Sequence, residues 1–162
     1  MKSLTFIFFL LTLMACSSNP DNTSALQEQV DSLQDKLDNS YKPGLGEFMS
    51  GIQVHHAKLW FAGTDNNWKL ADFEIKEIQE AIGDIRSFNT DRPEVESIGI
   101  INPAIDSITK AIQLRDQAMF RSSYTLLTNS CNNCHRATRH EFNVITIPTT
   151  PPFSNQSFQS SR

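Results

Sequence analysis

Hydrophobic residues recur every three or four positions along most of the chain, which is the spacing of one face of an α-helix. Residues 45–134 contain four such stripes. Their members are, in chain order, Leu45, Phe48, Met49, Ile52, His56, Leu59 and Trp60; Ala71, Ile75, Ile78, Ile82 and Ile85; Ile101, Ile105, Ile108 and Ile112; and Phe120, Tyr124, Leu127, Cys131 and Cys134. The only strand-like signal is a short apolar run at 142–147. The pattern predicts an all-α domain.

Turn and capping residues separate the stripes. Gly63 ends the first, and residues 89–93 interrupt the pattern after the second. Asn102, which precedes a proline, is predicted to cap the third helix, and Asp116 is the best candidate cap of the fourth. Four amphipathic helices joined by short connections predict an antiparallel up-and-down four-helix bundle at residues 44–141.

A separate amphipathic segment precedes this domain. Its apolar residues, spaced four, three and four positions apart, are Leu26, Val30, Leu33 and Leu37. They form a coiled-coil seam that is too short to be stable alone, and the segment resembles the opening of the small murein-type lipoproteins. Two interpretations are open: a zipper that makes a homodimer, and a solvated helical stalk.

The first residues have the pattern of an export signal. Lys2 precedes an apolar stretch that ends in Leu13-Met14-Ala15-Cys16. This ending resembles the lipobox of bacterial lipoproteins, in which the cysteine becomes the acylated first residue of the mature chain. The resemblance implies removal of residues 1–15, a lipid on Cys16, and an anchored linker and stalk at 16–43. The alternative is an ordinary signal peptide that contains a cysteine.

Charge and hydropathy limit the partners of the mature chain. Loss of Lys2 with the signal leaves 13 basic and 18 acidic residues, a net charge of −5. This mild acidity argues against nucleic acid or anionic lipid as a partner. The leader is too short to span a bilayer, so the lipid alone is expected to hold the chain at a membrane. Ser17 after the cysteine favours the outer membrane, by resemblance to enterobacterial sorting.

The pentapeptide Cys131-Asn132-Asn133-Cys134-His135 closes the fourth stripe. C-x-x-C-H is the attachment signature of c-type haem, in which two thiols add to the vinyl groups of one porphyrin and the imidazole binds the iron. Residues three apart on a helix share a face, so both sulfurs can reach one edge of the macrocycle. Because the cysteines continue the buried stripe, the porphyrin is expected to enter the core. A zinc site would need two further ligands, and a thioredoxin-like pair would need a βαβ unit.

A haem motif at the end of a fourth helix resembles the cytochrome c′ and cytochrome c-556 class. The segments 56–63, 131–142 and 151–156 also resemble a group of small bacterial cytochrome-like proteins. The resemblance spans roughly residues 44–158 and implies one haem c per chain. The lipid-type leader, the stalk and the long tail depart from the better-known members, which argues against a freely diffusing periplasmic carrier.

Candidates for the second axial position come from the first helix, which runs beside the fourth in an antiparallel bundle. His56 lies about 35° from the centre of the apolar stripe and His55 about 65° from it, so His56 is the inward histidine. It is either the distal iron ligand or a histidine bonded to a propionate or a carbonyl. Met49 shares this face, as a less favoured ligand or as core packing. The cytochrome c′ resemblance implies a third outcome, an open sixth site.

Further residues are candidates for contact with the haem. Arg136, Arg139 and His140 follow the motif and either pair with propionates or stay solvated at the helix end. Trp60 and Tyr124 lie on the stripes and either line the pocket or pack in the core.

Residues 142–162 are rich in Pro, Ser, Asn and Gln. They are expected to form an extended tail that is partly draped over the domain. Phe153 and Phe158 are its candidate anchors.

We therefore expect a lipid-anchored, periplasm-facing monohaem c-type cytochrome that transfers single electrons between redox partner proteins. A histidine sixth ligand would hold the potential low and a methionine would raise it. Two alternatives remain: a gas-binding haem protein that takes NO or CO at an open site, and an accessory lipoprotein with a structural haem. The sequence shows no nucleophile–base pair, phosphate-binding loop or second metal cluster, so enzymatic turnover is not expected.

Overall fold

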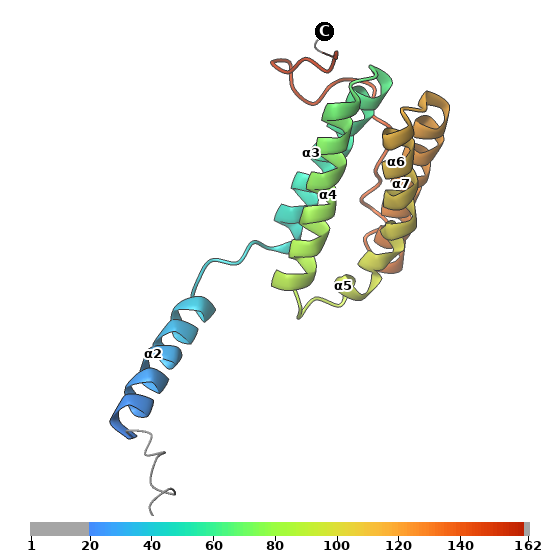
Figure 1. Ribbon diagram of the computed structural model, residues 1–162. Coiled ribbons are helices and arrows are strands. Elements are labelled where there is room, and N and C mark those ends of the chain that lie inside the picture. The colour runs from blue at the N-terminus through green and yellow to red at the C-terminus, as the bar shows by residue number, and fades with distance from the viewer. Residues whose placement is uncertain (1–19, 161–162) are drawn as a thin grey trace, which may run out of the picture. The chain divides into compact units, whose positions relative to one another are not determined.

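The computed structural model describes residues 20–160, and these residues are helical or irregular with no strand among them (Figure 1). This confirms the all-α prediction. The apolar run at 142–147 is irregular chain. The chain divides into two units, Met1–Tyr41 and Lys42–Arg162. The predicted signal at 1–15 and the lipid-bearing Cys16 lie outside the described residues.

The first unit contains helix α2, Pro20–Asp38. The helix forms where the coiled-coil spacing predicts one, and its four apolar side chains remain exposed to solvent. Two glutamine side chains bond one turn onward, Gln27 to Asp31 at 2.8 Å and Gln34 to Asp38 at 3.1 Å. Within residues 20–160, no helix combines the length and the apolar content that crossing a membrane requires.

In the second unit, α3 (Leu45–Thr64) and α4 (Trp68–Phe88) form one packed pair (Figure 1). Asn67 caps α4 by accepting a hydrogen bond from the Leu70 backbone N–H at 3.2 Å. Gly63 lies one residue before the end of α3, as predicted. The Phe120 ring lies so close to it that a Cβ at this position would collide with the ring. The glycine therefore permits the close approach of Phe120.

A short helix α5 (Glu94–Ser97) and a 3₁₀ turn η2 (Ile98–Ile101) lead into α6, Asn102–Leu114. The predicted Asn102 cap is wrong. The 3₁₀ turn runs directly into the helix, so Asn102 is itself helical, and its side chain accepts a bond from Arg86 at 3.4 Å. The predicted cap at Asp116 is confirmed: it precedes α7 (Gln117–Ala137), and its carboxylate accepts from the Met119 N–H at 2.9 Å.

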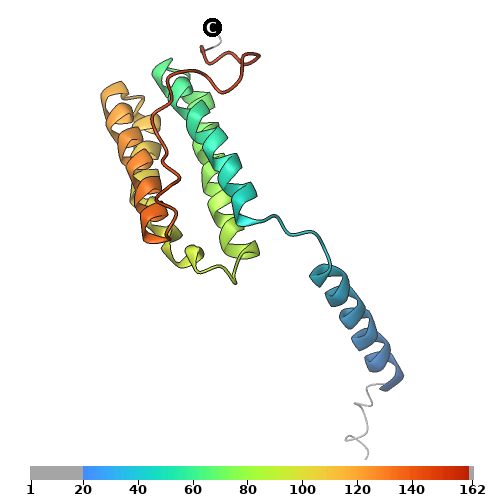
Figure 2. The same ribbon diagram turned by 180° about the vertical axis from the view of Figure 1, so that it is seen from behind.

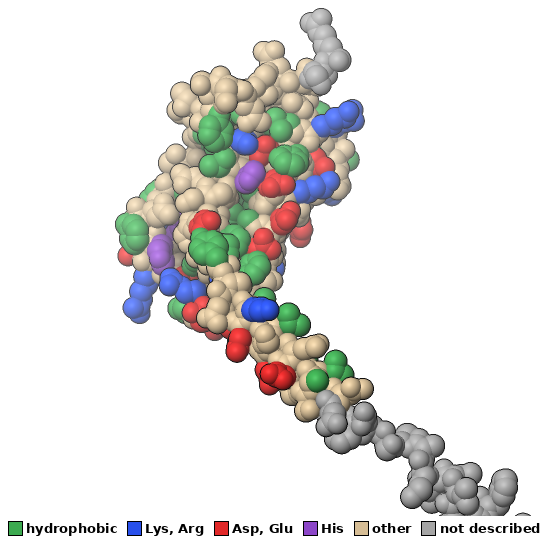
Figure 3. Space-filling model, turned by 90° about the vertical axis from the view of Figure 1, so that its left-hand side faces the viewer, with side chains coloured by type: hydrophobic (Ala, Val, Ile, Leu, Met, Phe, Trp, Pro, Cys, Tyr) green, Lys and Arg blue, Asp and Glu red, His purple; other side chains and the backbone are tan. Residues whose placement is uncertain are grey.

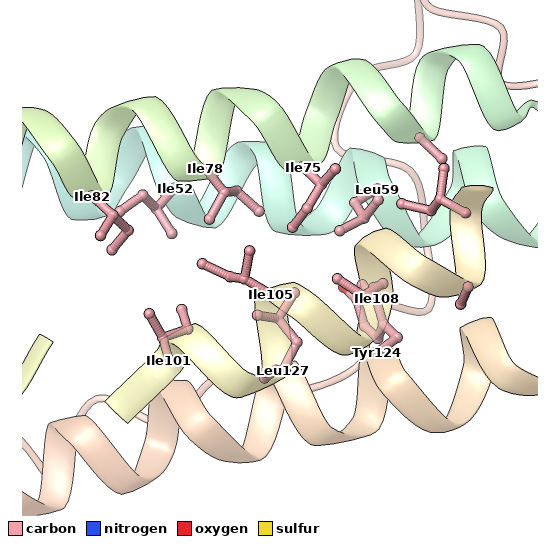
Figure 4. Packing of buried hydrophobic residues seen from close by; sticks show 14 of the residues in the cluster. Ile52, Leu59, Ile75, Ile78, Ile82, Ile101, Ile105, Ile108, Tyr124 and Leu127 are labelled. Carbon is pink, nitrogen blue, oxygen red and sulfur yellow. The ribbon is translucent and has the colours of Figure 1, made fainter. Parts of the chain in front are cut away.

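The core fills the space between the α3–α4 pair and the α6–α7 pair (Figure 4). Ile75 and Ile78 of α4 point toward Ile105 and Ile108 of α6, and all four are buried. Burial of one such side chain stabilises a fold by about 1.5–3 kcal/mol. The stripes read from the sequence are therefore the inner faces of these helices.

The tail turns back after α7 and runs along the domain (Figure 2). Near its end the Asn67 side chain donates to the Gln159 carbonyl at 3.2 Å, and the Phe158 ring packs on Phe61 with centroids 5.6 Å apart. Phe158 is buried, so its predicted role as an anchor is confirmed. Phe153 is 42% exposed and contacts the Lys58 ammonium group through its ring face.

Candidate functional site

A cleft opens between α3, η2, the end of α7 and the start of the tail. Its empty volume, including the open mouth, is about 810 Å³. Most of its wall is apolar and is made by Met49, Ile52, Ile82, Ile98, Ile101 and Ile145. All three chemically distinctive residues of the pentapeptide, Cys131, Cys134 and His135, line the same cleft.

The two cysteines are half-buried and unbridged. They lie in about the last two turns of α7, so the helix carries them to the cleft on one face. Burial raises the pKa of the Cys131 thiol to about 11, and burial also raises the pKa of Cys134. Both groups are therefore neutral thiols at pH 7, packed against apolar surroundings. The Cys134 sulfur also lies 3.7 Å from the Ser97 carbonyl oxygen.

His135 is oriented by the main chain of the tail. Its Nδ1 lies 2.7 Å from the Asn143 carbonyl oxygen. A carbonyl only accepts, so Nδ1 carries the proton, and in the neutral ring the lone pair falls on Nε2. An imidazole held in this way has the tautomer and the added basicity that metal-binding histidines usually take from a second hydrogen bond.

The segment that supplies this carbonyl is clamped to α7 by Asn132, the first variable position of the pentapeptide. The Asn132 amide donates to the Ile145 carbonyl at 2.8 Å and accepts from the Ile145 N–H at 2.8 Å. Sequence reasoning missed both Asn132 and Asn143. The only sequence signal for this clamp was the asparagine at position 132 inside the motif. Asn143 gave no signal, because it contributes its backbone carbonyl rather than its side chain. The neighbouring Asn133 points elsewhere and bonds Arg136.

His56 faces inward, as predicted, and is 3% exposed. Its Nε2 lies 2.9 Å from Thr128 Oγ1, and its Nδ1 lies 3.0 Å from the Tyr124 hydroxyl. Thr128 donates its own proton to the Tyr124 carbonyl, so it accepts from Nε2–H. Tyr124 shares its proton between the His56 carbonyl, at 2.7 Å, and Nδ1. Both ring nitrogens of His56 therefore have partners, and binding iron would break one of these bonds.

Burial lowers the pKa of His56 to about 4. The ring is therefore neutral over the physiological range, which suits its place beside an apolar cleft. His55 was predicted to lie on the rim. Its side chain is 23% exposed and bonds Glu74 of α4, and it does not line the cleft.

The rest of the α3 wall consists of Gly46, Met49, Ser50 and Gln53. Met49, predicted as a less favoured second axial ligand or as core packing, is half-buried and lines the cleft. A Cβ added at Gly46 would meet no atom within 4 Å, so this glycine leaves the mouth of the cleft open. Sequence reasoning missed Gly46 and Gln53, which are not apolar members of the stripe.

A second cleft of about 760 Å³ adjoins the first and shares Met49, Cys134 and His135 with it. The residues that line only this second cleft are Leu45, Arg92, Glu94, Thr138 and His140. Arg92 binds the Glu94 carboxylate through two hydrogen bonds, at 3.0 and 3.2 Å.

Only some of the residues predicted to contact a haem line one of these two clefts. His140 lines the second cleft, whereas Arg136 and Arg139 line neither. Trp60 packs against Tyr124 and Phe120 in the core and also lies outside both clefts. Tyr124 is buried, lines neither cleft, and bonds His56, which lines the first. Arg92 is a candidate that sequence reasoning missed, because it lies far from the motif in the chain.

A polar cluster occupies the outer side of the α3–α4 pair. Glu74 is fully buried, bonds His55 at 2.7 Å and lies 3.9 Å from the Lys58 ammonium nitrogen. Beside it, acidic side chains gather along a shallow groove lined by Glu47, Glu77, Glu80 and Asp84 (Figure 3). Glu74 lines neither cleft near the pentapeptide.

Among residues 20–160, no three His, Cys, Asp or Glu side chains gather into a group that could hold a metal ion. Comparisons with family models, with curated proteins and with solved structures gave no match to this chain.

Proposed function

We propose that this chain is a monohaem c-type cytochrome. Cys131 and Cys134 would hold the porphyrin through thioether bonds, and His135 would bind the iron through Nε2. The observation that carries the proposal is the convergence of two neutral thiols and an oriented imidazole on one apolar cleft. The C-x-x-C-H pattern supplies the chemical identity of the group.

The residues present fit a haem better than a bare ion. A porphyrin brings four nitrogen ligands of its own, so the protein needs to add only one or two. Among residues 20–160 no three His, Cys, Asp or Glu side chains are grouped to hold a bare ion, whereas His135 is oriented to supply one ligand. The isoleucine-rich wall suits an apolar macrocycle. The adjoining cleft offers Arg92 and His140 to its two carboxylates, and Arg92 would have to exchange its bonds with Glu94, which lines the same cleft, for bonds with a carboxylate.

The helical arrangement supports the cytochrome c′-like class within this proposal. Each of the pairs α3–α4 and α6–α7 consists of consecutive helices joined by a short turn, as in an antiparallel up-and-down four-helix bundle. The pentapeptide at the end of α7 then lies beside α3, as in the bundle inferred from the sequence.

The work proposed for this site is one-electron transfer between redox proteins of the bacterial envelope. A bound haem supplies a one-electron ferrous–ferric couple. The chain's own residues orient the imidazole through Asn143, exclude water with the isoleucine wall, and keep His56 uncharged beside the cleft. A lipid on Cys16 would hold the protein at the membrane, with the outer membrane favoured.

A second candidate function is binding of a small gas such as NO or CO at an open sixth site. One observation favours it: both nitrogens of His56 are engaged by Thr128 and Tyr124. If those bonds persist with haem in place, His56 is not an iron ligand, and the open mouth at Gly46 leaves room for a small ligand.

Absorption spectra test the proposal and separate its two forms. The full chain, expressed with a cytochrome c maturation system, is recorded in ferric and ferrous states and then with carbon monoxide. His56→Ala and Met49→Ala are compared with it. A low-spin spectrum that ignores carbon monoxide, and turns high-spin in one variant, identifies that residue as the sixth ligand and supports electron transfer. A high-spin wild type that binds carbon monoxide supports the gas-binding form. Absence of a haem spectrum would contradict both.

A further inference from the structure

One face of α2 is a row of apolar side chains that no described residue of its own unit covers. Leu26, Val30, Leu33 and Leu37 are 61%, 56%, 63% and 61% exposed (Figure 3). An isolated helix of this length is marginal in water, since most helical stability in proteins comes from packing of the apolar face. The face therefore needs an occupant.

The distribution of charge on α2 indicates which occupant fits. With Val30 and Leu37 at heptad positions a, and Leu26 and Leu33 at d, the four acidic residues within 26–38 fall at b or f, on the side away from the seam; they are Glu28, Asp31, Asp35 and Asp38. The positions that flank the seam, e and g, carry Gln27, Gln29, Gln34 and Lys36.

This arrangement suits an identical helix better than a basic partner. A helix that recognises a basic partner would place its carboxylates beside the seam, where e and g residues select partners by charge. Here two copies bring neutral glutamines together, with Gln29 of one chain opposite Gln34 of the other. Gln27 and Gln34 also bond Asp31 and Asp38, which draws those acidic groups into contacts along their own helix.

We propose that α2 pairs with α2 of a second copy of this chain in a parallel two-stranded coiled coil. Valine at an a position with leucine at both d positions favours two strands. The parallel direction rests on the proposed lipid anchor at Cys16, because two chains anchored in one membrane carry their first residues at the same end. Tethering also offsets the shortness of the seam by raising the effective concentration of the partner helix.

Cysteine crosslinking of the full chain in intact cells tests the pairing. Leu26→Cys places a thiol at a d position, which faces its own counterpart only in a parallel pair, and Glu28→Cys places one on the outer face. After mild oxidation, we expect a disulfide-linked dimer from Leu26→Cys at least tenfold stronger than from Glu28→Cys or wild type. Adding Leu33→Asp should abolish the Leu26→Cys dimer, whereas adding Asp35→Asn should leave it unchanged.

Several outcomes would overturn the proposal. Equal crosslinking at positions 26 and 28 would indicate random collision, and none at either would indicate a solvated stalk. Crosslinking of Leu26→Cys only to a co-expressed Leu37→Cys chain would indicate an antiparallel pair. A native mass above two chains for the detergent-solubilised wild type would exclude two strands. A haem stain of the same samples reports cofactor attachment separately, so failure of the pairing and failure of the haem assignment are distinguishable.

Discussion

The Nδ1 nitrogen of His135 lies 2.7 Å from the carbonyl oxygen of Asn143, eight residues farther along the chain. The chain returns to the histidine by a turn in which the Asn143 N–H donates to the His140 carbonyl at 2.9 Å. Asn132 then clamps Ile145 with two hydrogen bonds. The pentapeptide is therefore tied to the first residues of the tail, and the orientation of its imidazole depends on a segment outside the helix.

The clamp should matter for both stability and redox potential. Asn132→Ala removes two side-chain hydrogen bonds, which should cost about 1–3 kcal/mol in the free energy of unfolding at about 0.5–1.5 kcal/mol each. Loosening of the Asn143 carbonyl should also make His135 a weaker donor to the iron and raise the reduction potential of the holoprotein. Denaturant unfolding and redox titration measure the two effects.

Asn133→Ala is the matched control, because it removes the neighbouring asparagine, whose only described side-chain bond is with Arg136. It should change neither the free energy of unfolding nor the reduction potential appreciably. Equal effects of the two substitutions would mean that the clamp has no special role.

The open mouth of the cleft gives a second prediction. Gly46→Leu adds a side chain where a Cβ meets nothing within 4 Å, so the fold should tolerate it while the cleft is partly filled. We expect the haem content per chain to fall severalfold, as measured by absorbance against protein concentration.

Gly51→Leu provides the comparison, since a Cβ there also meets nothing within 4 Å and Gly51 lines the acidic groove instead. Both changes increase helix propensity, by up to about 1 kcal/mol. A Gly51→Leu protein that loses as much haem as Gly46→Leu would show that the cleft is not the haem site.

Burial of His56 predicts a pH-dependent stability. Its folded pKa of about 4 lies below the unfolded value of 6.5. Between these values the unfolded chain binds the extra proton, so this histidine lowers stability as the pH falls from 7 toward 4. From pH 7 to 5 its contribution amounts to about 2 kcal/mol by this linkage.

Urea unfolding of wild type and His56→Gln at pH 7 and pH 5 measures how much His56 contributes to the pH dependence of the free energy of unfolding. The variant should lose about 2 kcal/mol less than wild type over that interval. Parallel pH profiles for wild type and His56→Gln would contradict the assignment of a neutral buried ring.

The second cleft predicts which cation would act on the proposed haem. Arg92 lines it and Arg139 does not. Loss of a positive charge near the haem disfavours the reduced state, so Arg92→Gln should lower the reduction potential. Arg139→Gln should change it much less, although Arg139 follows the pentapeptide in sequence. A larger shift for Arg139→Gln would reverse the assignment.

The inner faces of the helices could be predicted from the sequence because burial imposes a regular spacing. The Asp116 cap could be predicted because it acts on the residues directly after it. The prediction of an Asn102 cap was wrong because a 3₁₀ turn runs directly into α6, and such a short turn has no periodic pattern of hydrophobic residues by which the sequence could reveal it.

The site was predictable only in part. Cys131, Cys134 and His135 are adjacent in sequence, so one motif placed them together. Asn143 contributes a backbone carbonyl, which carries no residue signature, and Arg92 reaches the site only through the fold. The inward direction of His56 followed from helical geometry, whereas its bonds to Tyr124 and Thr128 depend on the packing of α7 against α3.

Mass spectrometry of the denatured and reduced full chain, expressed with a cytochrome c maturation system, tests the haem assignment most directly. We expect the chain to carry the added mass of one haem, located on the peptide that contains Cys131 and Cys134. The double variant Cys131→Ala/Cys134→Ala should lack it. A wild-type chain of unmodified mass, with both thiols open to alkylation, would contradict the assignment of a c-type haem to this cleft.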